Sequence, residues 1–449
     1  MKLSVIGLGK LGAVMAGVFA DRGHQIIGVD VNEEFVSALN EGRPPVEEPG
    51  LAELIARNGS RLRATKDTAA AVAETEATFI IVPTPSDDDG AFSLRYVLPV
   101  VEAIGTALRH KNSYHLVVLS STVMPGATGG EVLPLLEASS GRKCGQDFGL
   151  CYNPEFIALG SVIRDMCRPD MILIGESDPR AGTLLAGVYE PVCENQPQVA
   201  RMNFVNAELT KLSVNTFVTT KISYANMLGE ICERLAGADV DEVTRALGLD
   251  TRIGPKYLKG ALGYGGPCFP RDNVAFAKLA RNLGLEAILA EATHKVNQLQ
   301  VPRLAALTKS LLPEGGAVGI LGVSYKPSTN VVEESQGMAL AAHLLAEGVK
   351  MNIYDPAAME NARRVLPEGK VSYHPSAAEC AGASQVVVIV TPWDEFRQLR
   401  PEHLNTTMGT PSVVDCWRIL DRGKFESGAN YVTLGIGYAA GRVAAPVLR

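Results

Sequence analysis

The chain has 449 residues, of which 46% are hydrophobic and 20% charged, and its formal net charge is −7. This length exceeds one ordinary hydrophobic core and favours two or three domains. The acidic balance argues against nucleic acid as a partner, and no apolar run is long enough to span a membrane. The 8 cysteines stand singly, without CxxC spacing, which is typical of reduced thiols and gives no metal site. A strand begins at once and leaves no room for a signal peptide, so we expect a cytoplasmic protein.

Strands and helices alternate in the N-terminal part of the chain. A helix through Ala20 is expected after the first strand. The expected strands are Leu3–Ile6, Gln25–Val29, Thr78–Val82, His115–Leu119 and the apolar run Phe148–Tyr152. This βαβ rhythm is typical of a parallel sheet.

A glycine motif lies between the first strand and the first helix. Gly7, Gly9 and Gly12 form GxGxxG, and Asp30 ends the next strand 18 residues after Gly12. Such a motif makes a tight turn, admits a pyrophosphate and packs a helix on a strand. Asp30 would accept hydrogen bonds from a ribose, and no basic residue follows it, so NAD is expected rather than NADP. The alternative is a glycine turn followed by a surface aspartate.

The middle of the chain is expected to be helical, whereas strands resume toward its C-terminal end. Helices are expected from about Asn206 to Leu235, in a shorter stretch after Asp239, and from Phe269 through Gln298, with a loop at residues 260–266. Strands resume at Val318–Val323, Met351–Tyr354 and Gln385–Val390, but without GxGxxG, so this sheet would bind a different nucleotide or none. We expect an α/β fold with two Rossmann-like doubly wound domains, joined by a long central helix and a helical middle domain. The expected boundaries are 1–203, 204–300 and 301–449.

The stretch from Gly263 to Asp272 contains three glycines, Cys268 and, four residues after the sulfur, Asp272. Glycines let a backbone pass close to a ligand. A thiol at a helix start is placed to be a thiolate nucleophile, because the N-terminus favours negative charge. A small buried hydrophobe beside a tight turn is the alternative.

Two further polar groups invite both a functional and a structural interpretation. Glu208, Lys211 and Asn215 share one face of the long expected helix. They are either buried and functional or a solvated polar stripe. Glu155 follows an expected strand and a proline, where it is either a base or an ordinary cap.

Together these pieces resemble the UDP-glucose/GDP-mannose dehydrogenase family over about residues 1 to 425. The motifs that carry the resemblance are GxGxxG, Glu48-Pro49-Gly50-Leu51, Thr84-Pro85-Ser86, Ser121-Thr122-Val123, Asn153-Pro154-Glu155-Phe156, the Glu208 to Asn215 face, Arg252-Ile253-Gly254, Gly263 to Asp272, Tyr325-Lys326-Pro327 and Arg418. The resemblance implies NAD-dependent oxidation of the C6 alcohol of a nucleotide sugar to a carboxylate, with two NAD per sugar. It also implies a homodimer, or a dimer of dimers, built on the long helix, with Arg252 reaching the neighbouring site.

The resemblance further implies a role for each matching residue. Cys268 would capture the aldehyde as a thiohemiacetal that becomes a thioester. The other implied catalytic residues are Lys211 and Asn215 for the oxyanion, Asp272 for the hydroxyl proton, Glu155 for the hydrolytic water, and Thr122 beside that water and the nicotinamide. The implied cofactor-binding residues are Gly7, Gly9, Lys10, Leu11, Gly12, Asp30, Thr84, Pro85, Ser121 and Thr122. The implied substrate-binding residues are Glu155, Phe156, Lys211, Asn215, Arg252, Tyr257, Lys259, Gly263, Tyr264, Gly265, Lys326 and Arg418.

Three positions depart from the family pattern. Pro267 stands where the family has serine or histidine, Leu159 where it has glutamate, and Glu333 where it has arginine. The last two bear on the nicotinamide end of the cofactor site. UDP-glucose to UDP-glucuronate is the expected reaction. The alternatives are GDP-mannose or a modified UDP-hexose as substrate, a nucleotide-sugar-binding regulator, and a single-step hydroxyacid dehydrogenase.

Overall fold

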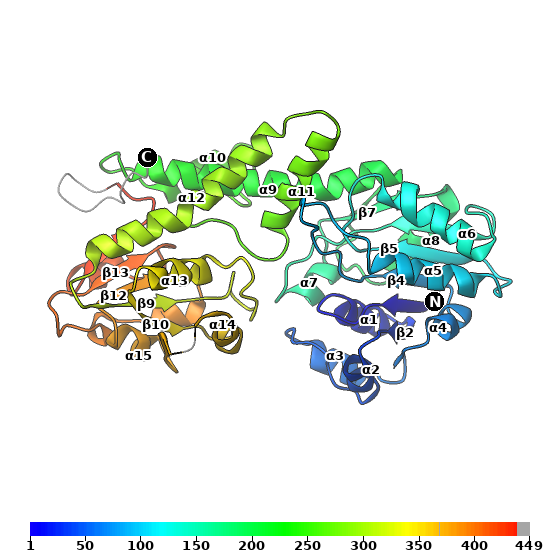
Figure 1. Ribbon diagram of the computed structural model, residues 1–449, viewed down its shortest axis with the longest axis horizontal. Helices are drawn as coiled ribbons and strands as arrows, with labels where there is room; N and C mark the ends of the chain where they lie inside the picture. The colour runs from blue at the N-terminus through cyan, green and yellow to red at the C-terminus, as the bar shows by residue number, and fades with distance from the viewer. Residues whose placement is uncertain (368, 438–449) are drawn as a thin grey trace. The chain divides into compact units, whose positions relative to one another are not determined.

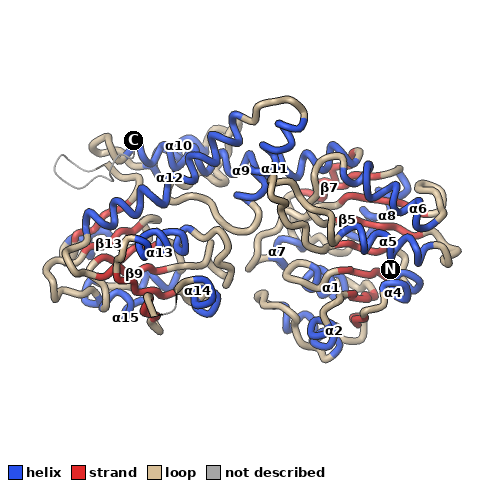
Figure 2. Tube along the Cα trace, in the orientation of Figure 1, coloured by secondary structure: helices blue, strands red, loops and turns tan. Residues whose placement is uncertain are grey.

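The computed structural model describes residues 1–367 and 369–437, and the chain groups into two compact units, Met1–Ser213 and Val214–Arg449. Figures 1 and 2 trace the helices and strands of both units. The long helix α9 (Phe204–Cys232) runs through the boundary between the units. It confirms the long helix that the sequence predicted.

The first unit is built on an eight-stranded sheet. Its strands are β1 (Lys2–Ile6), β2 (Gln25–Val29), β3 (Leu62–Thr65), β4 (Ala77–Ile80), β5 (His115–Leu119), β6 (Phe148–Tyr152), β7 (Met171–Glu176) and β8 (Gln198–Met202). Its helices are α1 (Gly12–Asp21), α2 (Glu33–Asn40), α3 (Leu51–Arg57), α4 (Thr68–Glu74), α5 (Val97–Leu108), a π-helical turn (Thr128–Val132), α6 (Leu133–Ser140), α7 (Val162–Cys167) and α8 (Pro179–Tyr189). The strand order is β3-β2-β1-β4-β5-β6-β7-β8, with all neighbours parallel except β6 and β7.

Helices cover both faces of this sheet, as Figure 1 shows. One apolar cluster joins α1, α3, α7 and α8 to one face, where the ring of Phe19 meets that of Phe79 edge-on at 5.2 Å. A second cluster joins α4 and α5 to the other face. The strand order reverses between β1 and β4, so loops leave the carboxyl ends of these strands toward opposite faces. Ligands of doubly wound sheets bind outside the carboxyl ends of the strands at such a reversal.

The second unit carries a helical part and a six-stranded parallel sheet. Its helices are α10 (Val240–Gly248), α11 (Phe269–Asn282), α12 (Ile288–Leu311), α13 (Gln336–Ala346), α14 (Met359–Val365), α15 (Ala377–Gly382) and α16 (Arg422–Glu426), with short 3-10 turns at Asp394–Gln398 and Pro401–His403. Its strands are β9 (Ala317–Leu321), β10 (Lys350–Tyr354), β11 (Val371–Tyr373), β12 (Val386–Ile389), β13 (Ser412–Asp415) and β14 (Asn430–Thr433), in the order β11-β10-β9-β12-β13-β14. This order matches that of β3-β2-β1-β4-β5-β6 in the first unit.

The two sheets agree in register as well as in strand order. Ile6 of β1 pairs with the last residues of β2 and β4, and Leu321 of β9 pairs with the last residues of β10 and β12. Asp30 directly follows β2, and Asp355 directly follows β10. The prediction of two doubly wound α/β copies is therefore confirmed, although the domain boundaries themselves stay a prediction.

Two expectations need correction. The single helix predicted from Phe269 through Gln298 is two helices, because the chain turns at Gly284, whose φ of +72° is left-handed. The second sheet also keeps more of the glycine pattern than the sequence indicated. Gly322 has a φ of +97°, like Gly7 at +100°, and a Cβ on Gly337 would lie 2.2 Å from the Gly322 carbonyl oxygen. The first and third glycine roles thus persist, separated by a longer loop that carries Tyr325-Lys326-Pro327.

Within residues 1–367 and 369–437, no helix is both long enough and apolar enough to traverse a lipid bilayer.

Candidate functional site

The glycine loop after β1 has the geometry that a pyrophosphate requires. A Cβ on Gly7 would lie 2.5 Å from the carbonyl oxygen of Ile81, and one on Gly12 would lie 1.8 Å from that of Gly7. These two glycines are needed for the turn and for the close approach of α1 to the sheet. Gly9, in contrast, has no atom within 4 Å of an added Cβ, so the middle of the loop is open on the ligand side. The residues present therefore fit a dinucleotide, with its phosphates at the start of α1.

Asp30 is held at the end of β2 by the same loop. Its carboxylate accepts the backbone N–H of Leu8 at 2.6 Å and that of Asn32 at 2.8 Å, one on each oxygen. Each oxygen keeps lone pairs for a ribose hydroxyl, and the side chain is only half-buried. In the second sheet the equivalent Asp355 is buried. One of its oxygens accepts two backbone N–H groups, a serine hydroxyl and the indole N–H of Trp393. Asp30 therefore keeps acceptor capacity that one oxygen of Asp355 has already used within the protein.

The loops after β4 and β5 lie at the same edge of the sheet as the glycine loop. The hydroxyl of Thr84 donates to the carbonyl of Thr122 at 2.7 Å, and the hydroxyl of Ser121 donates to that of Val82 at 2.7 Å. Threonine and serine here fasten two loops to each other at one edge of the sheet. The predicted residues Thr84, Pro85, Ser121 and Thr122 are thus brought together. Lys10, which is exposed, and Leu11 begin the neighbouring helix.

The polar face predicted on the long helix is buried, so the alternative of a solvated stripe is wrong. Glu208 is fully buried, and its carboxylate accepts the backbone N–H groups of Gly126 at 2.6 Å and Thr128 at 2.8 Å. It therefore caps the start of the π-helical turn after β5 and has a structural role. Lys211 and Asn215 follow on the same face at 7% and 8% exposure.

Lys211 is held against the loop that follows β6. Its Nζ donates to the carbonyl of Glu155 at 2.6 Å and lies 4.7 Å from the centre of the Phe156 ring. An ammonium removed from water in this way is stabilised by a carbonyl and an aromatic face. The site thus brings together three of the predicted residues within the first unit.

Burial raises the pKa of Glu155 to about 7. The hydroxyl of Tyr189 donates to Glu155 Oε1 at 3.0 Å, and this bond and the Lys211 charge both act to lower the pKa. A carboxylate with such a pKa can exchange a proton near neutral pH, as a general base must. The same Tyr189 hydroxyl lies 2.6 Å from Asn153 Oδ1. Sequence reasoning missed Tyr189, because nothing in its neighbourhood in the chain points to Glu155.

In the second unit, Cys268 occupies the N-cap position of α11 and is exposed, whereas the other seven cysteines are buried or half-buried. The alternative of a small buried hydrophobe is therefore wrong. The carbonyl of Cys268 accepts the N–H of Asp272 at 2.8 Å, which begins the helix. The Asp272 carboxylate is 1% exposed and accepts a hydrogen bond from Asn215 Nδ2 at 2.6 Å. Its other oxygen lies 3.5 Å from Arg271 Nε.

A second contact between α9 and α11 lies beside the first. Asn273 Nδ2 donates to Thr219 Oγ1 at 2.8 Å and to the Phe269 carbonyl at 2.9 Å. Asn215 and Thr219, one helical turn apart on α9, therefore bind the consecutive residues Asp272 and Asn273 of α11. The start of α11, which carries Cys268, is fixed to α9 by both.

The other predicted substrate residues fall into two groups. Tyr257, Lys259 and Lys326 are at least partly exposed, and Arg252 has a side chain 87% exposed that is bound to Asp250. Arg418, in contrast, uses all five of its N–H donors within the second unit. They reach both oxygens of Asp241 and the carbonyls of Gly260, Leu434 and Cys416. Arg418 would have to give up one of these bonds to contact a substrate, and its substrate role stays a prediction.

The three positions that depart from the family pattern differ in burial. Leu159 packs at the edge of the apolar cluster under α1, and Glu333 is exposed on the long loop before α13. Pro267 is half-buried directly before Cys268.

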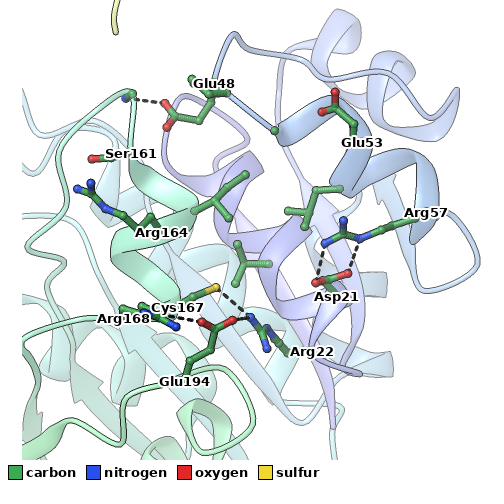
Figure 3. A pocket seen from close by; sticks show the side chains of 16 residues that line it. Asp21, Arg22, Glu48, Glu53, Arg57, Ser161, Arg164, Cys167, Arg168 and Glu194 are labelled. Atoms are coloured by element: carbon green, nitrogen blue, oxygen red, sulfur yellow. Dashed lines mark hydrogen bonds and ion pairs between the residues drawn. The ribbon is translucent and has the colours of Figure 1, made fainter. Parts of the chain in front are cut away.

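Glu48, Pro49 and Gly50 of the Glu48-Pro49-Gly50-Leu51 motif line a cavity of about 580 Å³ in the first unit, between α1, α3 and α7 (Figure 3). Glu48 accepts the backbone N–H groups of Gly160 and Val162, both at 2.8 Å, and so caps the start of α7. Arginines on the cavity wall are paired, Arg57 with Asp21 and both Arg22 and Arg168 with Glu194. The motif therefore has a structural role at this wall.

Comparisons with known proteins match the chain to one family of dehydrogenases. Profiles of the UDP-glucose/GDP-mannose dehydrogenase family match residues 1–193 as its NAD binding domain, 205–299 as its central domain and 319–422 as its UDP binding domain. A UDP-glucose 6-dehydrogenase of Haloferax volcanii is 38% identical over 97% of this chain and 100% of its own. A GDP-mannose 6-dehydrogenase of Azotobacter vinelandii is 36% identical over 79% of this chain and 81% of its own.

Solved structures give the same result. A UDP-glucose dehydrogenase from the archaeon Pyrobaculum islandicum superposes with a TM-score of 0.87 at 38% identity, covering 98% of each chain. This likeness extends over both sheets and the helices that follow α9. The chain belongs to the UDP-glucose/GDP-mannose dehydrogenase family.

Proposed function

We propose that this protein is an NAD-dependent UDP-glucose 6-dehydrogenase, which converts the C6 alcohol of the sugar to a carboxylate. The observation that carries the proposal is the exposed Cys268 at the start of α11, one turn before the buried Asp272, which Asn215 holds. A one-step dehydrogenase has no need of such a thiol. A regulator that only binds a nucleotide sugar has no need of it either.

The cofactor site is assigned to the first unit. Gly7, Gly9 and Gly12 with the start of α1 would hold the pyrophosphate, and Asp30 would accept the ribose hydroxyls. Lys10, Leu11, Thr84, Pro85, Ser121 and Thr122 complete the proposed cofactor residues. Bound NAD would supply the hydride acceptor for both oxidations of each sugar.

The chain's own residues account for the rest of the chemistry. Asp272 with a water takes the proton of the C6 hydroxyl as the aldehyde forms. The Cys268 sulfur then bonds to the aldehyde carbon, and the resulting alkoxide is steadied by Lys211 and Asn215. Oxidation of this thiohemiacetal leaves a thioester on the sulfur. Water activated by Glu155 adds to the thioester, the C–S bond breaks, and the carboxylate and the free thiolate are released.

The pKa of about 7 for Glu155 predicts a pH dependence of thioester hydrolysis. The carboxylate is the active base, so the rate should rise about tenfold per pH unit below 7 and level off above it. Glu155→Gln should remove this inflection and slow hydrolysis by roughly 10² to 10⁴-fold. Tyr189→Phe deletes a hydrogen bond that lowers the pKa, so its inflection should move to higher pH. Single-turnover release of the product between pH 5.5 and 9 measures each profile, and an unmoved inflection in Glu155→Gln would contradict the role.

A homodimer is the proposed assembly. In the second unit, α9 exposes apolar side chains at a spacing close to the helical heptad, with Phe217 at 65%, Tyr224 at 47% and Ile231 at 47%. A stripe of this kind on a soluble helix is typically covered by a partner. Arg252, which extends from the same unit, would reach the neighbouring subunit.

Phe217→Glu together with Tyr224→Glu should weaken this dimer by at least about 100-fold in Kd, because two charges would enter an apolar interface. Analytical ultracentrifugation across a concentration series measures the shift. Val365, an apolar residue of α14 with 65% exposure, provides the matched control as Val365→Glu. An unchanged association constant in the double variant would exclude α9 as the interface, and a larger assembly in the unaltered protein would indicate a dimer of dimers.

A further inference from the structure

The loop that leads into Cys268 is held by amide side chains. Residues 260–266 form no helix or strand, and the backbone polar groups of such a loop must find partners elsewhere when they are buried. Two asparagines supply most of these partners. One lies on α9 and the other on α12.

Asn226 of α9 binds the first half of the loop. Its Oδ1 accepts the N–H of Ala261 at 2.9 Å, and its Nδ2 donates to the carbonyl of Leu262 at 2.8 Å. The side chain is 2% exposed, so no water competes for these bonds. Arg418 adds a bond to the carbonyl of Gly260 at 2.7 Å.

Asn297 of α12 binds the second half in the same way. Its Oδ1 accepts the N–H of Tyr264 at 2.7 Å, and its Nδ2 donates to the carbonyl of the same residue at 3.0 Å. One amide thus pairs with both polar groups of one residue, as a neighbouring strand would. Gln336, the first residue of α13, also donates to the Tyr264 carbonyl at 3.3 Å.

The close approach of other protein atoms to this loop explains why residues 263 and 265 are glycines. A Cβ on Gly263 would lie 2.4 Å from Asn297 Oδ1 and 2.7 Å from Gln336 Oε1. A Cβ on Gly265 would lie 2.2 Å from the carbonyl oxygen of Glu334. Glycine is therefore required here so that the protein's own amides and carbonyls can approach the backbone.

We propose that Asn226 and Asn297 are positioning residues for the catalytic cysteine, acting through the loop 260–266. Three helices of the second unit, α9, α12 and α13, bind this loop together with Arg418, and the loop ends two residues before Cys268. A loop whose backbone is fixed in this way places the thiol and the residues beside it without help from a substrate. This inference rests on the proposed function for its catalytic consequence, but the fixing of the loop is testable without any substrate.

The test compares Asn226→Ala and Asn297→Ala with Asn352→Ala as the matched control. Asn352 is equally buried at 6% exposure and its Nδ2 donates to Ala383 O and Ser384 Oγ, both at 2.9 Å, but it lies in the C-terminal sheet. Hydrogen exchange followed by mass spectrometry on the intact protein reports on the loop. The amides of Ala261 and Tyr264 should exchange at least about tenfold faster in the respective loop variants, the factor expected for the loss of one hydrogen bond of ~1.4 kcal/mol. The control should leave the loop unchanged.

Kinetics supply the second readout. In both loop variants kcat/KM for UDP-glucose should fall by about 10 to 100-fold, while the KM for NAD stays unchanged, because a displaced catalytic group costs rate and not cofactor binding. The Asn352→Ala variant should lose a similar amount of thermal stability, but its kcat/KM for UDP-glucose should not fall in this way. Asn297→Asp keeps the acceptor for the Tyr264 N–H but sets a carboxylate oxygen against the Tyr264 carbonyl. Exchange of the Tyr264 amide should therefore stay closer to that of the unaltered protein, while kcat/KM should fall as in Asn297→Ala.

Unchanged loop exchange in both alanine variants, or faster exchange with unchanged kcat/KM, would overturn the inference. If one alanine variant fails to fold, the other alanine variant supplies the exchange comparison, and Asn297→Asp supplies the kinetic one. If the unaltered protein oxidises no nucleotide sugar, the proposed function fails, whereas the exchange data still show whether these asparagines hold the loop.

Discussion

Replacing Cys268 with serine should stop the formation of carboxylate while leaving nucleotide-sugar binding intact. The thiol is the exposed one among the eight cysteines and lies at the N-cap of α11, where a developing thiolate is favoured. Serine keeps the size of the side chain but is a far weaker nucleophile at neutral pH. Removal of a catalytic nucleophile costs on the order of 10⁴-fold or more in kcat, and we expect a loss of this size.

The measurement is the steady-state rate of UDP-glucuronate formation, with binding followed separately by calorimetry. Cys144→Ser is the matched control, because Cys144 is half-buried in the first unit and burial raises the pKa of its thiol. The control should retain full activity. A Cys268→Ser variant that forms the acid at more than about a tenth of the original rate would show that no covalent sulfur intermediate is needed.

Replacing Lys211 with methionine should lower kcat by roughly 10² to 10³-fold, the cost of removing one donor from an oxyanion. Lys211 is nearly buried, and its Nζ is oriented by the Glu155 carbonyl and the Phe156 ring. Methionine has a similar length and no charge. Since the Lys211 charge also lowers the pKa of Glu155, the inflection for hydrolysis should move to higher pH in this variant.

Lys221 provides the control for Lys211 on the same helix. Its Nζ donates to the carbonyls of Ile253 at 3.1 Å and Gly254 at 3.3 Å, so Lys221→Met removes a structural contact. We expect a change in kcat of less than about threefold there, which corresponds to under ~1 kcal/mol of transition-state stabilisation. Equal losses in the two lysine variants would mean that both act through the stability of α9.

Much of the fold is accessible from the sequence because its signals are local. The strands that hold the glycine loop, Asp30 and the Ser121-Thr122 pair are short apolar runs that end in polar residues, and each was located to within a few residues. The break between α11 and α12 was missed, because it depends on the left-handed backbone at Gly284 within a sequence of helix-forming residues. A single glycine is compatible with one continuous helix or with a break between two helices until its φ is known.

The residues of the candidate site also differ in how far the sequence alone reveals them. Cys268, Asp272, Lys211 and Asn215 could be predicted as site residues because they belong to compact motifs. Tyr189 and Asn297 were not, since each acts on a residue more than 30 positions away in the chain. Polar residues within predicted helices, as Asn226 and Asn297 are, carry the one signal that could have revealed them, because a buried helical amide needs a partner outside its helix.

The glycines near Cys268 show how one pattern can have two causes. The sequence suggested that they admit a ligand. In the structure, Gly263 and Gly265 admit the protein's own side-chain and backbone oxygens. The nucleotide loop at Gly9, which is open, remains the clearer case of a glycine that leaves room for a ligand.

The most direct test of the proposed two-step oxidation is the number of NADH formed per UDP-glucose consumed. The unaltered protein, given limiting UDP-glucose and excess NAD, should form two NADH and one UDP-glucuronate, with GDP-mannose and other UDP-hexoses run in parallel to define the substrate. A ratio of one would indicate a single-step dehydrogenase without a role for Cys268. No turnover with any of these sugars, despite measurable binding, would contradict the enzyme and leave a nucleotide-sugar-binding protein.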